Sequence, residues 1–391
     1  MKTIHISSLG KPVSRISLGC WAIGGGPAWG VEGDAAQAAK KNAIETIRAC
    51  PDVGINMLDT APGYNFGNSE RIIGEAIRDM SREDICIVTK YGLVWDREGT
   101  YFDTVGDTKL YRNLSGESIL REIDASLERL QTDYVDIYMS HWQSEAPYFT
   151  PVAETASVLN DLKAKGKIRG IGVANVTAEH IEEYMKYCKV DIVQAQYNML
   201  DREVEKELLP ICKEQDIILQ AYSPLAMGLL SGTLPHDYKP VAAQLFNKWF
   251  QPERMPKVFA FLEQMKPFMQ KYGCKMADLA LSWILAQDDH IVLLSGANTP
   301  EQIICNAHAA DVEIEPDDLA VMRELVFAKT SRKSLYALIE VVWFGKSFLK
   351  RAICSSSLTL FTSHMPTQCT HGLSVKAPCK SRHPKIGRAH V

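Results

Sequence analysis

Several features that would point to other classes of protein are missing from this sequence. Its 391 residues include 10 cysteines, but none belongs to a Cys-x-x-Cys pair, so we expect reduced, buried thiols and no metal site. No run reaches the ~18 apolar residues of a membrane span. The N-terminus also lacks the apolar core of a signal peptide. The sequence therefore predicts a cytoplasmic protein without a membrane partner.

The charge pattern excludes a further class. The formal net charge is -4, and before residue 345 the basic residues are interspersed with acidic ones. Nucleic-acid binding requires a basic face or stripe, which is missing here. We therefore expect a small-molecule partner rather than a nucleic acid. The sequence does not indicate an oligomeric state.

Strand-like and helix-like segments alternate along most of the chain. The predicted strands are residues 16–20, 55–59, 85–90, 135–140, 168–173, 192–196, 217–222 and 291–294. The predicted helices are residues 35–49, 69–80, a helix opening at 115, 152–165, 178–187, 203–215, helices within 257–287, and 300–309. Such alternation, with strands apolar on both faces, is typical of a parallel sheet enclosed by helices.

Two α/β architectures fit that alternation. A doubly wound open sheet would want a Gly-rich turn after its first strand, and residues 24–27 (GGGP) do not match G-x-G-x-x-G. The fold class expected is therefore α/β, a (β/α)8 TIM barrel. A hairpin is expected around Gly10, and long loops at residues 91–114 and 226–256 are candidate lids.

The end of the chain differs in composition from the rest. A closing helix is predicted at residues 316–328, so the barrel domain is expected to span residues 1–328. Residues 329–391 lose hydrophobic periodicity, and residues 385–391 (KIGRAHV) are one translation of a common sequencing adapter. We expect that a frameshift or assembly error replaced the native C-terminus by this irregular tail.

Four polar residues are expected to meet at one end of the barrel. Asp59, Lys90 and His141 each close a predicted strand, and Tyr64 follows shortly after Asp59. Because the strands of an α/β barrel open on one face, their C-terminal ends converge on one active site.

These residue types suit the reduction of a carbonyl group. An aldehyde or ketone accepts hydride readily only when its oxygen is protonated or hydrogen-bonded as negative charge develops. Tyr64 is the expected proton donor, but an ordinary tyrosine, with a pKa of ~10, is a weak acid at neutral pH. A cationic Lys90 would lower that pKa, and Asp59 would hold Lys90 charged and in place. His141 would orient the substrate oxygen or join the proton relay.

Longer motifs strengthen this interpretation. Residues 59–70 (DTAPGYNFGNSE) with 73–76 (IGEA), 166–173 (GKIRGIGV), 196–198 (QYN) and 222–225 (YSPL) resemble the signatures of the aldo-keto reductase superfamily. The resemblance extends from Leu18 to Ala328 and is nearest to the bacterial branch with inositol-operon and general-stress reductases. It implies a barrel that binds a nicotinamide cofactor, usually NADPH, and a catalytic tetrad. The tetrad residues are Asp59, Tyr64, Lys90 and His141.

The resemblance also implies cofactor contacts. Asn175 and Gln196 fall where the nicotinamide amide is held, and Tyr222 falls where an aromatic ring stacks on the nicotinamide. Pyrophosphate-side residues are Ser223, Pro224, Leu225 and Gly228, and adenosine-side residues are Gly296, Thr299, Gln302 and Asn306. Trp21 is expected beside the cofactor. Candidate substrate-pocket walls are Trp21, Phe66, Tyr91, Trp95 and Trp142.

The cofactor preference is a separate question. Residues 296–306 contain no lysine or arginine, although charge-assisted contacts are the strong way to hold the 2′-phosphate of NADP. We expect the 226–256 loop to supply Lys248 or Arg254 to that phosphate, so that NADPH is preferred and NADH remains possible.

Two other functions are compatible with some of these residues. An NADP(H)-binding redox sensor would dock on a partner, as potassium-channel β subunits do, and could retain the tetrad. A Schiff-base aldolase would use Lys90 as its nucleophile, but it leaves Tyr222, Gln196 and Asn175 without roles. A carbonyl-reducing enzyme accounts for more of the residues than either.

Overall fold

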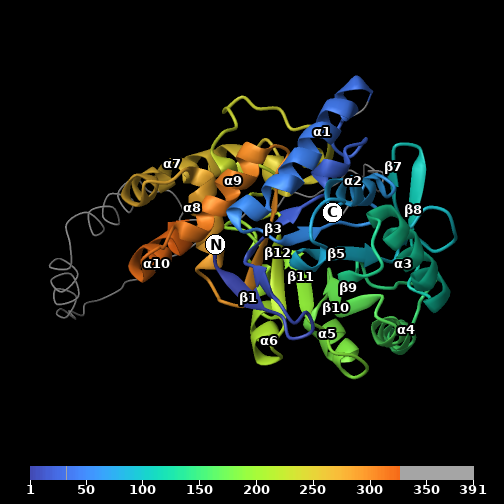
Figure 1. Cartoon of the computed structure of the whole chain (residues 1–391). Coiled ribbons are helices and arrows are strands. Elements are labelled where there is room, and N and C mark those ends of the chain that lie inside the picture. The colour runs from blue at the N-terminus through green and yellow to red at the C-terminus, as the bar shows by residue number, and fades with distance from the viewer. Residues whose placement is uncertain (32, 326–391) are drawn as a thin grey trace, which may run out of the picture. The chain divides into compact units, whose positions relative to one another are not determined.

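The computed structural model of the chain describes residues 1–31 and 33–325. Eight parallel strands follow one another around a closed barrel, and the last pairs with the first (Figure 1). They are β3 (Ile16–Gly19), β4 (Met57–Asp59), β5 (Cys86–Tyr91), β9 (Val135–Ser140), β10 (Ile168–Ala174), β11 (Ile192–Gln196), β12 (Ile218–Tyr222) and β13 (Ile291–Gly296). The predicted (β/α)8 barrel is confirmed.

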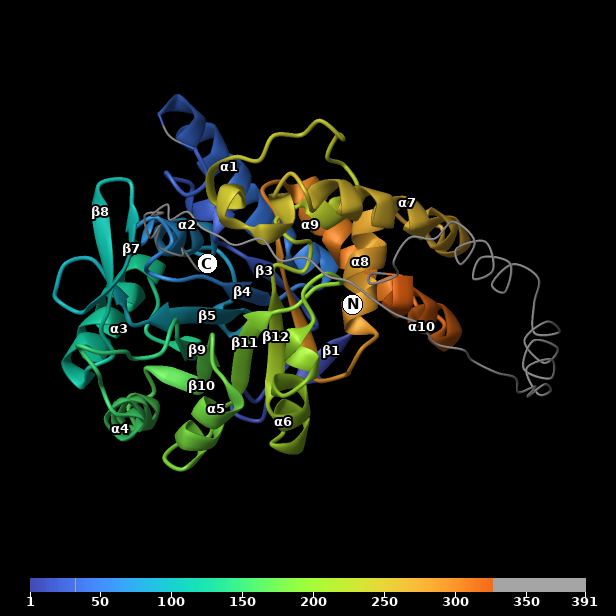
Figure 2. The same ribbon diagram turned by 180° about the vertical axis from the view of Figure 1, so that it is seen from behind.

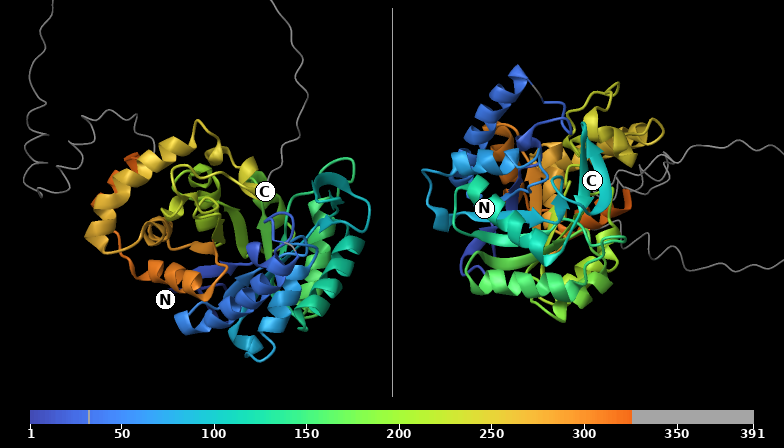
Figure 3. Two further views of the ribbon diagram at one scale, coloured as in Figure 1. Left: turned by 90° about the horizontal axis from the view of Figure 1, so that it is seen from above. Right: turned by 90° about the vertical axis from the view of Figure 1, so that its right-hand side faces the viewer.

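Helices surround the strands, as the view along the barrel shows (Figure 3). They are α1 (Asp34–Ala49), α2 (Asn68–Ala76), α3 (Gly116–Leu130), α4 (Val152–Ala164), α5 (Ala178–Met185), α6 (Leu208–Glu214), α7 (Met255–Tyr272), α8 (Met276–Leu285), α9 (Pro300–His308) and α10 (Pro316–Leu325). In α3, Ile119, Ile123 and Leu130 are fully buried. Ser115 caps this helix by accepting a hydrogen bond from the Ser118 N–H.

The N-terminal end of the barrel is filled by apolar side chains, which we call the lower core. It consists of Ile6, Leu9, Val13, Met57, Cys86, Val88, Ile137, Met139, Ala174, Ile192, Ile218 and Val292. The first three come from the predicted hairpin, which is formed by β1 (Thr3–His5) and β2 (Pro12–Ser14). The hairpin therefore packs into the end of the barrel opposite the strand C-termini.

Two predicted segments differ from the structure. Residues 91–114 are not an irregular loop, because β6 (Leu93–Val94), β8 (Thr108–Arg112) and β7 (Thr100–Val105) form a small antiparallel sheet. Its β7–β8 ribbon projects beside the barrel (Figure 2). The single helix expected at residues 203–215 is instead a short turn followed by α6. Pro210 lacks the N–H that a continuous helix would use at this position.

The last described helix is α10. Its start at Pro316 matches the predicted closing helix, whereas residues 326–328 and the predicted tail, 329–391, lie outside the described residues. Among the helices of the described part, none combines the length and the apolar character needed to cross a membrane.

Candidate active site

Three of the four predicted catalytic residues are in direct contact. The Lys90 Nζ donates to Asp59 Oδ1 at 2.6 Å, to the Thr60 carbonyl at 2.9 Å and to Tyr64 Oη at 3.1 Å. Asp59 ends β4, and Lys90 lies at the matching end of the neighbouring strand β5. Both side chains are fully buried, whereas Tyr64 is half-buried. The sequence spacing therefore folds into one hydrogen-bonded group, as predicted.

The segment after β4 is built to hold Tyr64 in place. Asn65 and Phe66 have φ angles of 49° and 53°, in the left-handed region that non-glycine residues rarely adopt. The Asn65 side chain donates to the Gly24 carbonyl at 2.9 Å. A Cβ on Gly26 would lie 2.4 Å from Asn65 Oδ1, so glycine is required there. The surrounding structure therefore maintains a strained turn beside a functional group.

The Asp59–Lys90 ion pair is held in a site without water access. Burial raises the pKa of Asp59, and Lys90 and Gln194 oppose that rise. Burial by itself lowers the pKa of Lys90, but Asp59 and Tyr64 outweigh it, so the net pKa is raised. Each ion is therefore stable because the other is present.

The pKa of Tyr64 is raised, although the sequence predicts that Lys90 would lower it. Burial raises the pKa of Tyr64, Lys90 lowers it, and Asp59 raises it again, which leaves the pKa above its ordinary value. Lys90 does act in the predicted direction, but it does not overcome desolvation. Tyr64 is therefore a neutral phenol at physiological pH, and Lys90 stabilises the phenolate that would form on proton transfer.

His141, the fourth predicted residue, faces the ring of Tyr64. The two ring centroids are 5.6 Å apart with an interplanar angle of 81°. Burial, together with Lys90, holds the pKa of His141 well below its usual range. The imidazole is therefore neutral at pH 7, and its buried Nδ1 has no hydrogen-bond partner among the described residues. A neutral imidazole is suited to donate a hydrogen bond to a substrate oxygen.

Two of the predicted cofactor residues connect to this group. The Asn175 side chain donates to the His141 carbonyl at 3.0 Å and accepts from Tyr222 Oη at 2.9 Å. Asn175 has a φ angle of 54°, another left-handed position. The Tyr222 ring therefore lies at the end of β12, and its hydroxyl is held by Asn175, which follows β10, two strands away in the barrel.

The sequence motifs point to Gln196 as a site residue, but they do not reveal Gln194, which contacts Asp59 in the structure. Gln196 donates to Asp201 Oδ2 at 2.9 Å, away from the ion pair. Gln194, two positions earlier on the same face of β11, donates to Asp59 Oδ2 at 2.7 Å. The sequence does contain one indication of this role: Gln194 is a polar residue at an inward position of an otherwise apolar strand.

The predicted pyrophosphate and adenosine residues occupy two separate segments. After β12, Ser223 and Gly228 bound a turn in which Ala226, Met227 and Gly228 all have positive φ angles, and Pro224 and Leu225 lie between. At the other segment, Thr299 caps α9 by accepting from the Gln302 N–H, and Asn306 donates to the Gly296 carbonyl at 3.0 Å. A capped helix start carries partial positive charge that favours an anion.

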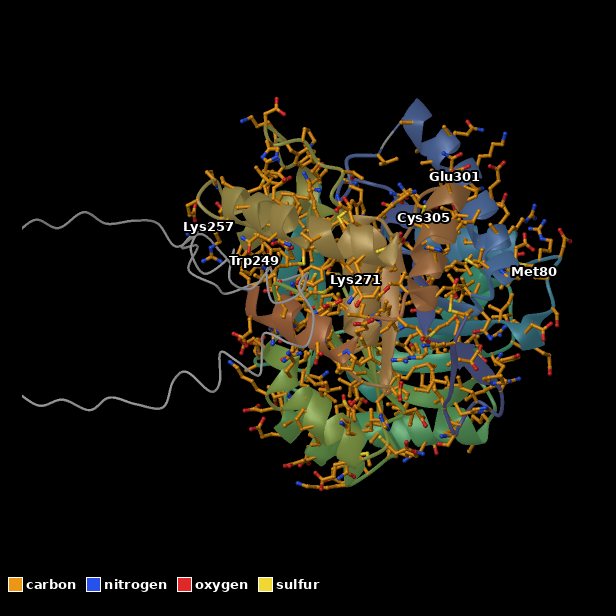
Figure 4. The ribbon with its side chains drawn as sticks, turned by 90° about the vertical axis from the view of Figure 1, so that its left-hand side faces the viewer. Met80, Trp249, Lys257, Lys271, Glu301 and Cys305 are labelled. Atoms are coloured by element: carbon orange, nitrogen blue, oxygen red, sulfur yellow. The ribbon has the colours of Figure 1, made fainter. Side chains whose placement is uncertain are left out.

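Lys248 and Arg254, predicted to bind a 2′-phosphate, both have protein partners in this structure. Lys248 forms an ion pair with Asp201, and Arg254 stacks 5.8 Å from the Trp249 ring. The Trp249 indole N–H also donates to Asp201, at 2.8 Å. Figure 4 shows Trp249 and Glu301, which is in the first turn of α9, far apart in the view. The ion pair with Asp201, which follows β11, holds Lys248 near the end of that strand.

The predicted pocket walls divide into two groups. Trp21 lies 6.3 Å from the Tyr64 ring, and Phe66 packs edge-on against Trp95 at 5.4 Å. Trp142 follows His141 directly and packs against Phe102. Tyr91, by contrast, is completely buried against Tyr138 on the outer face of the barrel sheet. The prediction that Tyr91 lines the pocket was wrong, because it alternates with the inward Lys90.

Comparisons with known proteins agree with this geometry. Residues 15–326 match the model of the Aldo/keto reductase family. The chain is 51% identical over 328 residues to the NADH-specific methylglyoxal reductase of Escherichia coli (strain K12), covering 84% of this chain and 99% of that protein. It is 36% identical to aldo-keto reductase YhdN of Bacillus subtilis (strain 168), covering 78% and 87%.

Solved structures give the same result. The glycerol dehydrogenase AKR11B4 from Gluconobacter oxydans has a TM-score of 0.73 at 29% identity, covering 83% of this chain and 94% of that one. An aldo-keto reductase from Klebsiella pneumoniae in complex with NADPH has a TM-score of 0.64 at 25% identity, covering 84% and 97%.

The chain therefore belongs to the aldo/keto reductase family and is an oxidoreductase that reduces carbonyl groups. The Schiff-base alternative conflicts with the site, because a nucleophilic lysine must be neutral and Lys90 is held charged by Asp59. The redox-sensor alternative is not favoured by these comparisons. Within the described residues, no group of three or more His, Cys, Asp or Glu is placed to hold a metal ion.

Proposed function

We propose that this protein reduces small α-oxoaldehydes of the methylglyoxal type and that it uses NADH in preference to NADPH. The observation that carries carbonyl reduction is the contact of Lys90 with both Asp59 and Tyr64 at the C-terminal end of the barrel. The substrate class is supported by the relative at 51% identity, which bears the name methylglyoxal reductase. Catalysis is assigned to residues 1–328.

The proposed roles follow from the charges of the site. Tyr64 Oη donates its proton to the substrate oxygen while Lys90, 3.1 Å away, stabilises the phenolate that remains. Asp59 keeps Lys90 charged throughout. The neutral His141 donates a hydrogen bond to the same oxygen, which stabilises the negative charge that develops there. Bound nicotinamide supplies the hydride.

The cofactor site fits a dinucleotide without a 2′-phosphate. Asn175, Tyr222, the strained turn ending at Gly228 and the capped start of α9 are the residues proposed to hold it. The adenosine-side segment has no cation, and Lys248 is already neutralised by Asp201. A phosphate with nearly two negative charges would find no charged partner within residues 296–306. These charges, together with the NADH-specific relative, favour NADH over the NADPH that the resemblance implies.

The decisive experiment measures NADH and NADPH oxidation with methylglyoxal and a panel of aldehydes, ketones and sugars. We expect the highest kcat/KM with methylglyoxal and NADH, and turnover lost in Tyr64→Phe with NADH affinity retained. A preference for NADPH would contradict the cofactor assignment. A Tyr64→Phe enzyme with wild-type rates would contradict the assigned proton donor.

A further inference from the structure

The second oxygen of Asp59 is held by a chain of buried polar side chains that crosses the barrel interior. Gln194 Nε2 donates to Asp59 Oδ2 at 2.7 Å and also to Gln220 Oε1 at 2.8 Å. Gln220 Nε2 in turn donates to Ser17 Oγ at 3.1 Å, and Ser17 donates to the Leu293 carbonyl at 2.7 Å. Side chains from four strands, β4, β11, β12 and β3, and a carbonyl group from a fifth, β13, therefore form one hydrogen-bonded chain.

The direction of every hydrogen bond in this chain is determined by its two ends. The Leu293 carbonyl can only accept, so the Ser17 hydroxyl must donate to it and is left to accept from Gln220. Gln220 must then turn its amide nitrogen to Ser17 and its oxygen to Gln194. Because the Gln220 oxygen only accepts, Gln194 must donate to it, and the same Gln194 nitrogen also donates to Asp59.

The same chain selects the charge state of Asp59. An ionised carboxylate only accepts hydrogen bonds, and Gln194 offers it an N–H. The amide of Gln194 cannot rotate by half a turn to present its oxygen, because that oxygen would then face Gln220 Oε1. The other titratable groups facing Asp59 are Lys90, Tyr64 and Cys20.

Gln220 lies deeper in the barrel than Tyr222, the proposed cofactor contact on the same strand. It is fully buried, it pairs in register with Gln194, and it lies two positions before Tyr222 toward the lower core. Its side chain also contacts the Met57 sulfur, which belongs to the lower core, at 3.7 Å. Any effect of Gln220 on the reaction must therefore pass through Gln194.

We propose that Gln220 and Ser17 are positioning residues, which act through Gln194 to keep the Asp59 carboxylate oriented toward Lys90. The inference rests on the proposed roles of Asp59 and Lys90 in carbonyl reduction. Without Gln220, the Gln194 amide is free to turn its oxygen toward Asp59. That repulsion weakens the ion pair with Lys90 and makes Asp59 easier to protonate.

The kinetic test compares Gln220→Leu with Gln220→Glu. A glutamate at this fully buried position is neutral, so its carbonyl oxygen accepts from Gln194 and its hydroxyl donates to Ser17. We expect Gln220→Leu to lower kcat/KM about tenfold at neutral pH, the size of one lost charge-assisted hydrogen bond, and to move its acid limb to higher pH. NADH affinity stays unchanged, and Gln220→Glu regains most of the activity.

A second pair of variants separates positioning from stability. Ser17→Ala removes the acceptor that orients Gln220 and should give a smaller shift of the same acid limb. Ser282→Ala removes a similarly buried hydroxyl, which lies 2.7 Å from both the Asp278 and the Ala309 carbonyl oxygens and can donate to either, in the distant α8 region. We expect it to lower stability without moving the pH profile. Equal pH profiles for Ser17→Ala and wild type would overturn the role of Ser17.

A measurement without turnover distinguishes failure of this inference from failure of the proposed function. The ¹³C carboxyl signal of Asp59, identified by its loss in Asp59→Asn, is followed against pH in aspartate-labelled protein. We expect Asp59 to titrate at higher pH in Gln220→Leu than in wild type or Gln220→Glu. An unchanged titration overturns the inference even if the wild type is an active reductase. A wild type that reduces no carbonyl overturns the proposed function alone.

Discussion

The interior of the barrel has two ends of opposite character. On β11, Ile192 belongs to the lower core, and Gln194, two residues further on the same inward face, belongs to the chain that reaches Asp59. Both side chains are almost fully buried, at 0% and 4% exposure, so burial alone does not distinguish them. The lower core is stabilised by removal of apolar surface from water. The upper end is tolerated only because its buried polar groups have partners.

This comparison indicates how the protein divides its tasks. Substitutions at the lower end should act on stability, because packing is non-directional and no ligand comes near. Substitutions at the upper end should act on activity as well as on stability, because hydrogen-bond direction and charge determine the reactive state. The following predictions address that division, from the largest expected effect to the smallest.

The largest effect is expected from Lys90→Met at the upper end. It removes the only cation in contact with Asp59 among the described residues and leaves a buried carboxylate without a counter-ion. We expect kcat to fall by at least about 10³-fold and the free energy of unfolding to fall by about 3–5 kcal/mol. Steady-state kinetics and urea denaturation measure the two effects. The Asp59→Leu/Lys90→Met double variant should regain stability without activity, and a double variant no more stable than Lys90→Met would contradict this account.

Substitutions on a single strand should separate the two ends. Ile192→Ala creates a cavity in the lower core and should lower the free energy of unfolding by about 2–5 kcal/mol, with kcat unchanged. Gln194→Leu should lower kcat, and it should also cost about 1–3 kcal/mol of stability, because Asp59 Oδ2 and Gln220 Oε1 lose their buried donor. Denaturant melts and kcat are measured on both variants. If Ile192→Ala lowered kcat as much as Gln194→Leu, the division between the ends would not hold.

A pH-dependent effect is expected just outside the barrel, behind β5. Glu122 is buried, accepts from the Gly92 N–H and Ser118 Oγ at 3.0 Å each, and burial raises its pKa to about 8. The native state therefore keeps this proton while the unfolded chain loses it above its ordinary pKa of 4.5. Wild-type stability should decline as the pH rises from about 4.5 to 8.

Glu122→Gln removes that titration. Between pH 5 and pH 8, its stability relative to wild type should improve by about 1–3 kcal/mol, measured by denaturant unfolding at each pH. A constant difference between the two proteins across this range would show that Glu122 has the same pKa in the native and unfolded states.

The smallest effect is expected on the surface, remote from both ends. Lys41 and Glu45 lie one turn apart on α1 at 3.9 Å, with side chains 78% and 50% exposed. Exposed pairs of this kind contribute little, so Lys41→Ala should change the free energy of unfolding by less than about 0.5 kcal/mol. Thermal unfolding provides the check, and a loss above about 1 kcal/mol would reveal an unrecognised role for this helix.

Parts of the site were predictable from the sequence and parts were not. Asp59 and Lys90 were located because each closes an apolar run, and the ends of parallel strands meet on one face. Gln194 was overlooked because a glutamine inside a strand does not show whether its amide has partners. Lys248 was matched to a phosphate by charge, but the carboxylate that binds it, Asp201, becomes its neighbour only after folding.

The sequence by itself determined the strand and helix alternation, the barrel class and the identity of the residues that meet at its mouth. Hydrophobic periodicity and the ends of strands depend on residues that are close in the sequence, so they can be read without knowledge of the tertiary structure. Only the tertiary structure decided which way the Gln194 amide points, which partner holds Lys248 and that Tyr91 faces away from the pocket. These depend on distances between distant segments, because hydrogen bonds and ion pairs act over a few ångströms.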